Sequence, residues 1–375
     1  MSERDETVSL AFAGGGTGGH LVPGVHLVRW LERETSKPIE LVWFNSGRKI
    51  EDRVLGSFRS EQTTLRRVAL ALEPKGGGAP SLLRTTMRAA PETLRVRREL
   101  VTSGASVVVG LGGFTSLAPI LAARTRNLPI VMLEINAVAG RATRTLGRFA
   151  DHVVHAWPAS VPEGAVAPRH EVLGPPLDPS YAEPVTAEAK LAFLRSFELD
   201  VERPLLVVLG GSQGAGALNA FLREHARALV EAGLSVVHQV GPGRLSEGAD
   251  ADLANYVRVE YLERVGDALG AATCVLARGG ASTLAEIAAR RVPAVVVPYP
   301  HHADRHQFEN ARALGAGVEL VEEQNLGEQA VARLLGLIGP EGEATRVRMS
   351  RALESALDPE AGRRLARLVL KAARA

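Results

Sequence analysis

Short apolar runs alternate with longer amphipathic stretches along nearly the whole chain, and this alternation predicts strands separated by helices. In the first half the expected strands are Val8–Ala13, Glu40–Phe44, Ser106–Leu111, Ile130–Leu133 and His152–His155. In the second half they are Leu205–Leu209, Ser235–Gln239, Val257–Tyr261, Cys274–Ala277 and Ala294–Val297. Several runs are continuously apolar, as is typical of parallel strands that helices cover on both faces. The pattern therefore predicts a doubly wound α/β architecture.

The chain is long enough for two such domains, since single cores rarely grow to 375 residues. The stretch Gly174–Pro179 has three prolines in six residues and cannot continue a helix or a central strand, so we expect the hinge there. This places an N-terminal domain at residues 1–175 and a C-terminal domain at residues 176–354. The stretch Arg346–Ala375 is helical in pattern, and its last part, about residues 355–375, is a candidate to pack back on the first domain.

Composition and charge disfavour several classes of protein. A formal net charge of +2 gives no overall electrostatic case for binding nucleic acid. The single Cys274 excludes an intrachain disulfide and fits a reducing compartment. No apolar run reaches the length of a membrane-spanning helix, and the polar start Met1–Glu6 does not resemble a secretory signal. We therefore expect a cytoplasmic protein.

Two glycine-rich loops carry the first chemical signal. Gly14–His20 follows the first expected strand, and Gly210–Ala215 follows the first strand of the second half. Glycine lets backbone N–H groups approach a phosphate closely, and the N-terminus of the helix that follows favours an anion. Two such loops predict two nucleotide-type domains and an enzyme that handles a phosphorylated sugar donor.

Other classes of protein with glycine-rich loops fit less well. The spacing of Gly14–His20 is not a clean G-x-G-x-x-G, and no acidic residue ends the second expected strand to hold a ribose, which disfavours a dinucleotide oxidoreductase. Neither loop is followed by the lysine of a P-loop NTPase. A tight strand-to-helix turn without a ligand stays open as the alternative for the first loop.

His20 stands at the start of the helix that is expected after the first loop. The positive end of the helix dipole disfavours the imidazolium form and should keep the imidazole neutral. A neutral imidazole can accept a proton from a sugar hydroxyl, so His20 is a candidate general base. A histidine that only hydrogen-bonds a ligand or a neighbouring loop is an equally weighted alternative.

The segment Arg278–Glu286 is the strongest local signal in the second half. It follows an expected strand and offers backbone amides with the hydroxyls of Ser282 and Thr283 at a helix start, which suits a diphosphate. Glu286, one helical turn further on, can accept two hydrogen bonds from a ribose diol, which favours a nucleoside diphosphate over free phosphate. A local cap or salt bridge is the alternative for Glu286.

The histidines of His301–Gln307 look at first like a metal cluster. Their spacing matches no zinc pattern, and no cysteine or second carboxylate group joins them, so we expect no metal. A polar loop whose His306 and Gln307 hydrogen-bond sugar hydroxyls is the better interpretation.

Five arginines stand against one glutamate between Arg84 and Arg98, interleaved with apolar residues at helical spacing. Such a surface suits anionic lipid, so peripheral and salt-sensitive attachment to a membrane is one interpretation. A solvated helix packed on its own domain is slightly favoured by the sequence alone, because Pro91 interrupts the pattern.

Together these segments resemble the MurG family, the UDP-N-acetylglucosamine transferases of peptidoglycan synthesis. The resemblance runs from about Val8 to about Thr345 and is carried by Gly15–His20, Gly110–Phe114, Glu134–Asn136, Gly210–Ala215, Arg278–Glu286 and Asp304–Asn310. It implies a GT-B glycosyltransferase fold, with two Rossmann-like domains and an interdomain cleft.

The resemblance implies an activity as well. This is the inverting, metal-independent transfer of GlcNAc from UDP-GlcNAc to the 4-hydroxyl of MurNAc in the undecaprenyl-diphosphate-linked MurNAc-pentapeptide, with no cofactor. It implies a peripheral location on the cytoplasmic face of the cell membrane. A UDP-sugar transferase with a different acceptor and a UDP-GlcNAc 2-epimerase are the alternatives.

Roles for particular residues follow from the same resemblance. Thr17, Gly18 and Gly19 would lie at the donor sugar and the acceptor diphosphate, with His20 the candidate base and Glu134 a second catalytic group. Asn136 would contact the sugar region. Ser212 and the backbone of Gly280, Ala281, Ser282, Thr283, Leu284 and Ala285 would hold the donor diphosphate. Leu262 would present its backbone to uracil, Glu286 would bind the ribose, and His306 and Gln307 would bind the GlcNAc hydroxyls.

A few positions depart from the family pattern. The family usually has Gln where this chain has Ile135 and Tyr where it has Phe114. It usually has Gly-Asn-Pro-Val-Arg where this chain has Gly174–Asp178. Asp178 thus replaces an arginine that would help to hold the nucleotide, which reverses the local charge.

Overall fold

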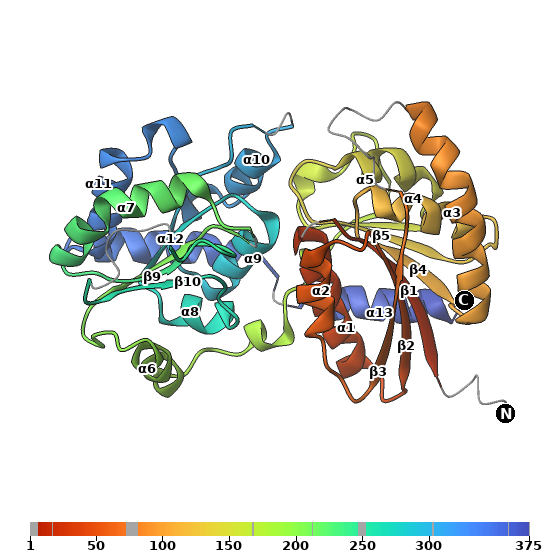
Figure 1. Cartoon of the computed structure of the whole chain (residues 1–375), viewed down its shortest axis with the longest axis horizontal. Helices are drawn as coiled ribbons and strands as arrows, with labels where there is room; N and C mark the ends of the chain where they lie inside the picture. The colour runs from red at the N-terminus through yellow and green to blue at the C-terminus, as the bar shows by residue number, and fades with distance from the viewer. Residues whose placement is uncertain are drawn as a thin grey trace. The chain divides into compact units, whose positions relative to one another are not determined.

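The computed structural model describes residues 7–16, 18–72, 82–166, 169–211, 213–246, 253–301, 304–358 and 360–374, without the side chains of residues 50 and 82–88. The chain forms two compact units (Figure 1). Unit 1 contains Met1–Pro179 and the C-terminal Glu360–Ala375, and unit 2 contains Ser180–Pro359. Each unit is built around its own parallel sheet.

Unit 1 contains a seven-stranded parallel sheet in the order β3-β2-β1-β4-β5-β6-β7. The bounds are β1 (Val8–Ala13), β2 (Ile39–Asn45), β3 (Thr63–Ala69), β4 (Val107–Gly110), β5 (Ile130–Glu134), β6 (His152–His155) and β7 (His170–Val172). The strand order reverses between β1 and β4, which are hydrogen-bonded neighbours. Open α/β sheets bind ligands at such a point, beyond the carboxyl ends of the strands.

Helices cover both faces of this sheet, with α3 and α4 on one face and α1 and α13 on the other (Figure 1). The helices are α1 (Gly18–Glu34), α2 (Lys49–Gly56), α3 (Leu82–Thr102), α4 (Leu117–Arg124), α5 (Arg141–Leu146) and α13 (Ala361–Ala373), with short 3-10 turns η2 (Phe114–Ser116), η3 (Gly147–Phe149) and η4 (Pro158–Ser160).

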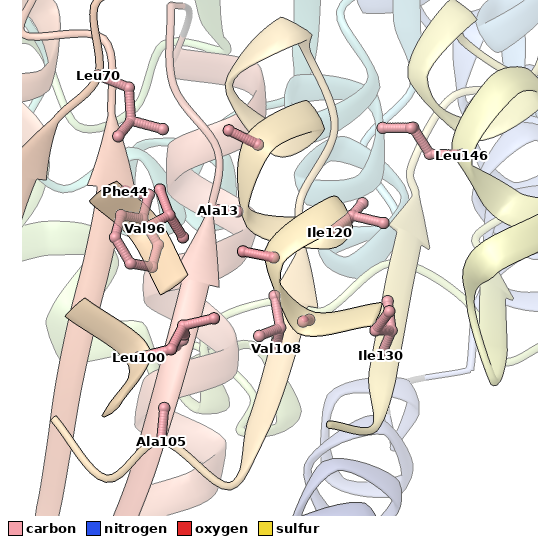
Figure 2. Close-up of a cluster of buried hydrophobic side chains, with 14 of the residues drawn as sticks. Ala13, Phe44, Leu70, Val96, Leu100, Ala105, Val108, Ile120, Ile130 and Leu146 are labelled. Atoms are coloured by element: carbon pink, nitrogen blue, oxygen red, sulfur yellow. The ribbon is translucent and has the colours of Figure 1, made fainter. Parts of the chain in front are cut away.

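The core of unit 1 follows from the alternation of side chains along each strand. Ala13, Phe44 and Val108 belong to one buried cluster with side chains of α3 and α4 such as Leu100 and Ile120 (Figure 2). The neighbouring residues Phe12 and Trp43 are also fully buried but lie outside that cluster, and their ring centroids are 5.3 Å apart.

The C-terminal helix α13 packs on α1. Gly362 approaches Trp30 so closely that a Cβ at residue 362 would lie 2.2 Å from the indole Nε1. Arg367 also forms an ion pair with Glu34 at 2.7 Å. The close approach explains why a glycine stands in the first turn of this helix.

The stretch that we expect to be helical over residues 346–375 forms two helices, of which the last belongs to unit 1. Residues 357–360 separate α12 (Gly342–Ala356), which belongs to unit 2, from α13, which belongs to unit 1. The earlier passage from unit 1 to unit 2 lies between Pro179 and Ser180, four residues after the expected boundary at residue 175.

The proline-rich segment that we expect to act as the hinge is buried and bound to α1 within unit 1. The carbonyl of Leu177 accepts a hydrogen bond of 2.7 Å from Trp30 Nε1. The carboxylate of Asp178 forms an ion pair with Arg29. The Asp178 charge is thus engaged in fixing this segment to its own unit.

Unit 2 contains a six-stranded parallel sheet in the order β10-β9-β8-β11-β12-β13. The strands are β8 (Leu205–Leu209), β9 (Ser235–Gln239), β10 (Tyr256–Val259), β11 (Cys274–Ala277), β12 (Ala294–Val296) and β13 (Val318–Leu320). The helices are α6 (Ala187–Ser196), α7 (Gly216–Glu231), α8 (Val265–Ala271), α9 (Ala281–Arg290), α10 (His306–Ala313), α11 (Glu328–Ile338) and α12, with 3-10 turns η5 (Pro179–Ala182), η6 (Gly315–Gly317) and η7 (Glu323–Asn325).

All ten expected strands are present, each within two residues of its expected ends. Three further strands, β3, β7 and β13, were not expected, and each lies at the edge of its sheet. Both sheets are parallel wherever their strands pair, which confirms the doubly wound α/β prediction.

Candidate functional site

The first glycine-rich loop and His20 lie at the switch point of the unit 1 sheet. The loop follows β1, and Gly18 and Gly19 open α1, so His20 stands in the first helical turn as expected. The imidazole lies against Gly112 and Gly113 after β4: a Cβ on Gly112 would be 3.1 Å from His20 Cδ2. These two glycines have φ values of +100° and +74°, which side chains disfavour.

A hydrogen bond assigns a tautomer to His20. Its Nδ1 lies 3.3 Å from the carbonyl oxygen of Gly15. A carbonyl oxygen can only accept, so Nδ1 carries the hydrogen in this contact and Nε2 is the basic nitrogen. Thr17, which the resemblance places at the donor sugar and the acceptor diphosphate, lies outside the described residues.

A buried carboxylate that sequence reasoning missed holds the same loop. Glu51 of α2 is 1% exposed, and its Oε1 accepts hydrogen bonds from the Gly16 amide at 2.7 Å and from Ser46 Oγ at 2.7 Å. Its Oε2 accepts from the Arg48 amide at 2.9 Å. Burial alone would raise the pKa of Glu51, but the bonds from Ser46, Gly16 and Arg48 outweigh it and hold that pKa below its usual value.

Glu134, expected to be catalytic, ends β5 with its carboxylate turned into the loop that follows. Its oxygens accept hydrogen bonds from the Asn136 amide at 3.0 Å, the Asn136 side chain at 3.1 Å, the Gly140 amide at 2.7 Å and Thr143 Oγ1 at 2.6 Å. The residue is 4% exposed. Asn136, at half-buried depth, is therefore positioned by Glu134.

In unit 2 the corresponding glycine-rich loop follows β8 and precedes α7, and Ser212 within it lies outside the described residues. Gly214 has a φ of +72°, and a Cβ there would lie 2.2 Å from the carbonyl oxygen of Val240. The side chain of Gln239 donates a hydrogen bond of 3.0 Å to the Gly211 carbonyl. This loop is thus held by close backbone packing and neutral hydrogen bonds.

A chain of uncharged side chains, from Asn219 to Tyr256, supports the residues that pack against this loop. Asn219 Nδ2 donates to the Val240 carbonyl at 3.0 Å, and Asn219 Oδ1 accepts from His238 Nε2 at 3.1 Å. His238 Nδ1 lies 2.9 Å from the Tyr256 hydroxyl. Burial, with a smaller effect of Arg258, lowers the pKa of His238 to about 4, so its imidazole is neutral near pH 7.

The predicted diphosphate segment lies where β11 runs into α9, beside the β8 loop. The Arg278 amide donates to the Leu209 carbonyl at 3.2 Å, which ties the two loops together. Gly280 precedes the first turn of α9, while Ala281, Leu284 and Ala285 are buried toward the core. The half-buried side of α9 therefore contains Ser282, Thr283 and Glu286.

The hydroxyl of Ser282 is the polar atom of this helix start that points to a ligand. Its Oγ is buried and has no hydrogen-bond partner within the described part of the chain. Buried polar atoms of native proteins nearly always have a partner, so an oxygen-rich ligand at the start of α9 would supply one. Glu286 lies four residues further on, on the same side of the helix.

Gln307 and His306 begin α10, and the structure gives each a protein partner. Gln307 Oε1 accepts from the Gly279 amide at 3.2 Å and from the Tyr299 amide at 2.9 Å, so this side chain joins two loops. His306 Nδ1 lies 2.7 Å from the Asp304 carboxylate. That hydrogen bond is the main cause that lowers the pKa of Asp304.

Two further features complete the carboxyl edge of the unit 2 sheet. Leu262 follows the edge strand β10 and is buried. Arg278, which sequence reasoning gave no separate role, is 8% exposed, donates to the Val297 carbonyl at 3.1 Å and pairs with Glu323 at 2.5 Å.

No group of three His, Cys, Asp or Glu within the described ranges is arranged to hold a metal ion, and His302 lies outside those ranges.

Both halves of the chain match models of one protein family. Residues 10–155 match the glycosyltransferase family 28 N-terminal domain, and residues 205–356 match its C-terminal domain. The UDP-N-acetylglucosamine--N-acetylmuramyl-(pentapeptide) pyrophosphoryl-undecaprenol N-acetylglucosamine transferase of Saccharopolyspora erythraea is 34% identical over 368 residues, which are 97% of this chain and 94% of that protein. The chain belongs to the MurG family.

Solved structures agree with this assignment in fold. Acinetobacter baumannii MurG has a TM-score of 0.72 and 24% identity, with 98% of this chain and 99% of that chain covered. The UDP-GlcNAc 2-epimerase of Neisseria meningitidis, solved with UDP-GlcNAc, has a TM-score of 0.66 and 16% identity, with 97% of this chain and 100% of that chain covered. These likenesses confirm the expected GT-B fold, which MurG enzymes share with epimerases.

The basic segment of this MurG-family chain lies on α3, which continues through Pro91. The side chains of Arg84 and Arg88 are not described. Further along, Leu94 and Val101 are 60% and 54% exposed, and the exposed Arg97 and Arg98 lie between them at helical spacing. Among the helices of the described residues, none is long and apolar enough to cross a membrane.

Proposed function

We propose that this chain catalyses the transfer of GlcNAc from UDP-GlcNAc to the 4-hydroxyl of MurNAc in undecaprenyl-diphosphate-linked MurNAc-pentapeptide, with inversion. The acceptor oxygen forms a bond to the anomeric carbon as the bond from that carbon to the diphosphate breaks. The acceptor proton goes to a base, and UDP leaves. The near full-length identity of 34% to a transferase named for these substrates is the observation that carries the proposal.

His20 is the proposed base. The contact of its Nδ1 with the Gly15 carbonyl leaves Nε2 as the nitrogen that accepts the acceptor proton. Its place in the first turn of α1 favours the neutral form from which a base must start. A base of this kind contributes about 10²–10⁴ to the rate.

The leaving diphosphate is the proposed ligand of the loops at the start of α7 and α9. Backbone amides at a helix start stabilise developing negative charge without a metal. The partnerless Ser282 Oγ supports this assignment, and Ser212 is proposed to add a second hydroxyl. In the same unit, Leu262 is proposed to contact uracil through its backbone, Glu286 to bind the ribose, and His306 to bind GlcNAc.

Two side chains take modified roles in this proposal. The Glu134 carboxylate accepts four hydrogen bonds from the loop after β5, which supports a role in positioning Asn136 instead of a direct catalytic one. The Gln307 amide oxygen accepts two backbone hydrogen bonds, so we assign any contact with GlcNAc to its amide nitrogen.

Attachment to an anionic membrane surface is proposed for the exposed side of α3. Leu94 and Val101 provide apolar area, and Arg97 and Arg98 provide positive charge between them. A surface of this kind binds acidic lipid peripherally and loses affinity as salt rises.

An assay with labelled UDP-GlcNAc tests the activity against its alternatives. With the muramyl-pentapeptide lipid present, we expect a labelled disaccharide lipid. No disaccharide, together with transfer to another lipid or glycan, would favour a different acceptor. Formation of UDP-ManNAc without any acceptor would favour the 2-epimerase, whose structures share this fold.

A further inference from the structure

We propose that Glu51 is a positioning residue for His20 and acts through the peptide group between Gly15 and Gly16. The inference rests on the proposed function, because it concerns the residue assigned there as the base. It adds a carboxylate from α2 to the machinery around the first glycine-rich loop.

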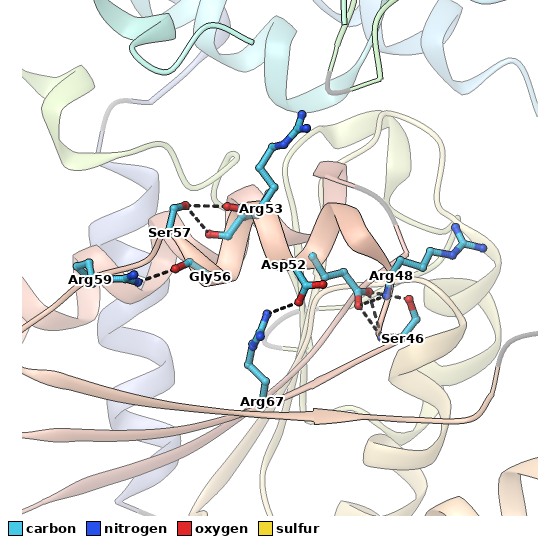
Figure 3. A network of polar contacts seen from close by, with 10 residues as sticks. Ser46, Arg48, Asp52, Arg53, Gly56, Ser57, Arg59 and Arg67 are labelled. Carbon is cyan, nitrogen blue, oxygen red and sulfur yellow. Dashed lines mark hydrogen bonds and ion pairs between the residues drawn. The ribbon is translucent and has the colours of Figure 1, made fainter. Parts of the chain in front are cut away.

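The carboxylate is buried and surrounded by hydrogen-bond donors. Besides the Gly16 amide, the Ser46 amide and hydroxyl and the Arg48 amide all donate to it, at 2.7–3.1 Å. Figure 3 shows Ser46 and Arg48 beside the first turn of α2, within this network of polar contacts. Four donor groups fix the carboxylate more firmly than a helix cap requires, and one of them belongs to the catalytic loop.

The peptide group between Gly15 and Gly16 links Glu51 to His20. A trans peptide is planar, and its N–H and C=O point in opposite directions. Its N–H, that of Gly16, donates to Glu51 Oε1 at 2.7 Å, and its C=O, that of Gly15, lies 3.3 Å from His20 Nδ1. Fixing one end of this plane therefore fixes the direction in which the other end meets the imidazole.

The sequence of the loop accommodates this arrangement. A Cβ on residue 15 would lie 2.3 Å from Glu51 Oε1, so the carboxylate requires a glycine at that position. The Arg48 guanidinium donates to the next carbonyl, that of Gly16, at 2.9 Å. Arg48, just before α2, and Glu51, in its first turn, thus hold two successive peptide groups of the loop.

The chemical consequence concerns both the tautomer of His20 and the charge it acquires. A peptide whose N–H donates to a carboxylate is polarised, which makes its C=O a stronger acceptor for the Nδ1 hydrogen. Nε2 then stays basic and takes the acceptor proton, while the Nδ1 hydrogen stays in place. In a Ser-His-Asp triad the aspartate stabilises the imidazolium that forms. Here Glu51 does so for His20 through the peptide group that lies between the carboxylate and the imidazole.

Nitrogen NMR of the imidazole tests the inference without substrate. In protein labelled with ¹⁵N-histidine, with His20 assigned by comparison with His20→Gln, we expect a protonated Nδ1 and an unprotonated Nε2 in the wild type. In Glu51→Gln we expect a rise in the Nε2–H tautomer. A wild-type His20 in the Nε2–H form, or identical tautomers in the two proteins, would overturn the proposal.

Steady-state kinetics supply the second measurement. We expect Glu51→Gln to lower kcat by about tenfold or more, with the full contribution of a general base, about 10²–10⁴, as the upper limit. The KM for UDP-GlcNAc should stay within about twofold of wild type. The matched control is Asp52→Asn, which removes the neighbouring carboxylate, 67% exposed and paired with Arg67, and should leave both constants unchanged. A rise in KM with kcat unchanged would contradict the proposal.

The two proposals fail in different ways. Full activity of His20→Gln would contradict the assignment of His20 as the base. The comparison of tautomers would still decide whether Glu51 determines which ring nitrogen of His20 carries the hydrogen. If Glu51→Gln does not fold, Glu51→Asp takes its place, since a shorter side chain cannot hold the amides of Gly16 and Arg48 together. The wild-type tautomer alone can overturn the inference.

Discussion

The two glycine-rich loops follow the first strand of each unit, yet the protein holds them by different means. In unit 1 the buried, ionised Glu51 binds the Gly16 amide. In unit 2 the loop is held by contact of Gly214 with the Val240 backbone and by a neutral chain from Asn219 to His238.

The difference fits the chemistry proposed for each loop. A carboxylate beside the unit 1 loop supports a histidine that acquires positive charge when it takes a proton. The unit 2 loop, which is proposed to bind the leaving diphosphate, is held by neutral groups and backbone packing, and it offers backbone amides at a helix start to the anion. The same supersecondary unit is thus proposed to support a base in unit 1 and to bind the leaving group in unit 2.

The largest effect is expected where a side chain would meet backbone. Gly214→Ala adds a Cβ at 2.2 Å from the Val240 oxygen at a φ of +72°, so we expect a loss of about 4 kcal/mol in denaturant unfolding. Gly211→Ala is the matched control, because its φ is +77° and, apart from its chain neighbours, no atom of the described residues lies within 4 Å of the added Cβ. It should cost about 1 kcal/mol. Equal losses would show that backbone packing does not hold this loop.

Acid should lower the free energy of unfolding, because it protonates His238, one of the uncharged side chains that support the unit 2 loop. The folded pKa of His238, about 4, is below the ordinary histidine value of 6.5, so the stability that the neutral imidazole contributes is complete above about pH 6.5 and is lost as pH falls toward 4. The shift corresponds to about 3 kcal/mol. His155 of unit 1, whose pKa burial also lowers to about 4, adds to the same decline. Unfolding free energies from pH 7 to 4 should fall less steeply in His238→Gln; an unchanged slope would contradict the assignment.

In unit 1 the corresponding clash is with a side chain and should be relieved by a second change. Gly15→Ala places a Cβ 2.3 Å from Glu51 Oε1, for an expected cost of about 2 kcal/mol. Because Glu51→Ala removes the obstacle, the double variant should be more stable than the sum of the single losses predicts. Strict additivity in this double-mutant cycle would mean that the two residues do not meet.

The smallest effect is expected at the surface of α3. Arg97→Glu with Arg98→Glu should weaken sedimentation with anionic vesicles at low salt, by about 1 kcal/mol per charge. Arg223→Glu, at an exposed position of α7, is the control in unit 2. Binding that survives both high salt and the double change would assign attachment to another surface.

The sequence predicted the interior strands of both sheets and missed three of the four edge strands, β3, β7 and β13. Continuous apolar runs identify β8 and β11 because helices bury both faces of these strands. The edge strand β3, by contrast, contains Arg66 and Arg67 and leaves much of its length exposed, so it has no such run. Edge strands need less apolar surface, and because they contain polar side chains, a search for apolar runs in the sequence does not detect them.

The loops of the candidate site could be predicted from the sequence because their shape requires glycine, whereas the contacts that hold them join residues distant in sequence and could not. Glycines at residues 14–16 and 210–214 indicated the loops because close approach needs glycine. Glu51 reads as an ordinary helix-start carboxylate, and its bond to Gly16 spans 35 residues, so no local pattern reveals it. Likewise, three prolines predicted a hinge, whereas Arg29 and Trp30 of α1 hold that segment in unit 1.

Calorimetry of UDP binding, combined with turnover, tests most directly whether unit 1 provides the base and unit 2 binds the nucleotide. We expect His20→Gln to bind UDP like the wild type while kcat falls by about 10²–10⁴, because the proposed role of His20 is to take the acceptor proton. We expect Glu286→Ala to weaken UDP binding by about tenfold or more, the value of a hydrogen bond to a charged group. Wild-type affinity in Glu286→Ala, or an equal loss of UDP affinity in both variants, would contradict the account.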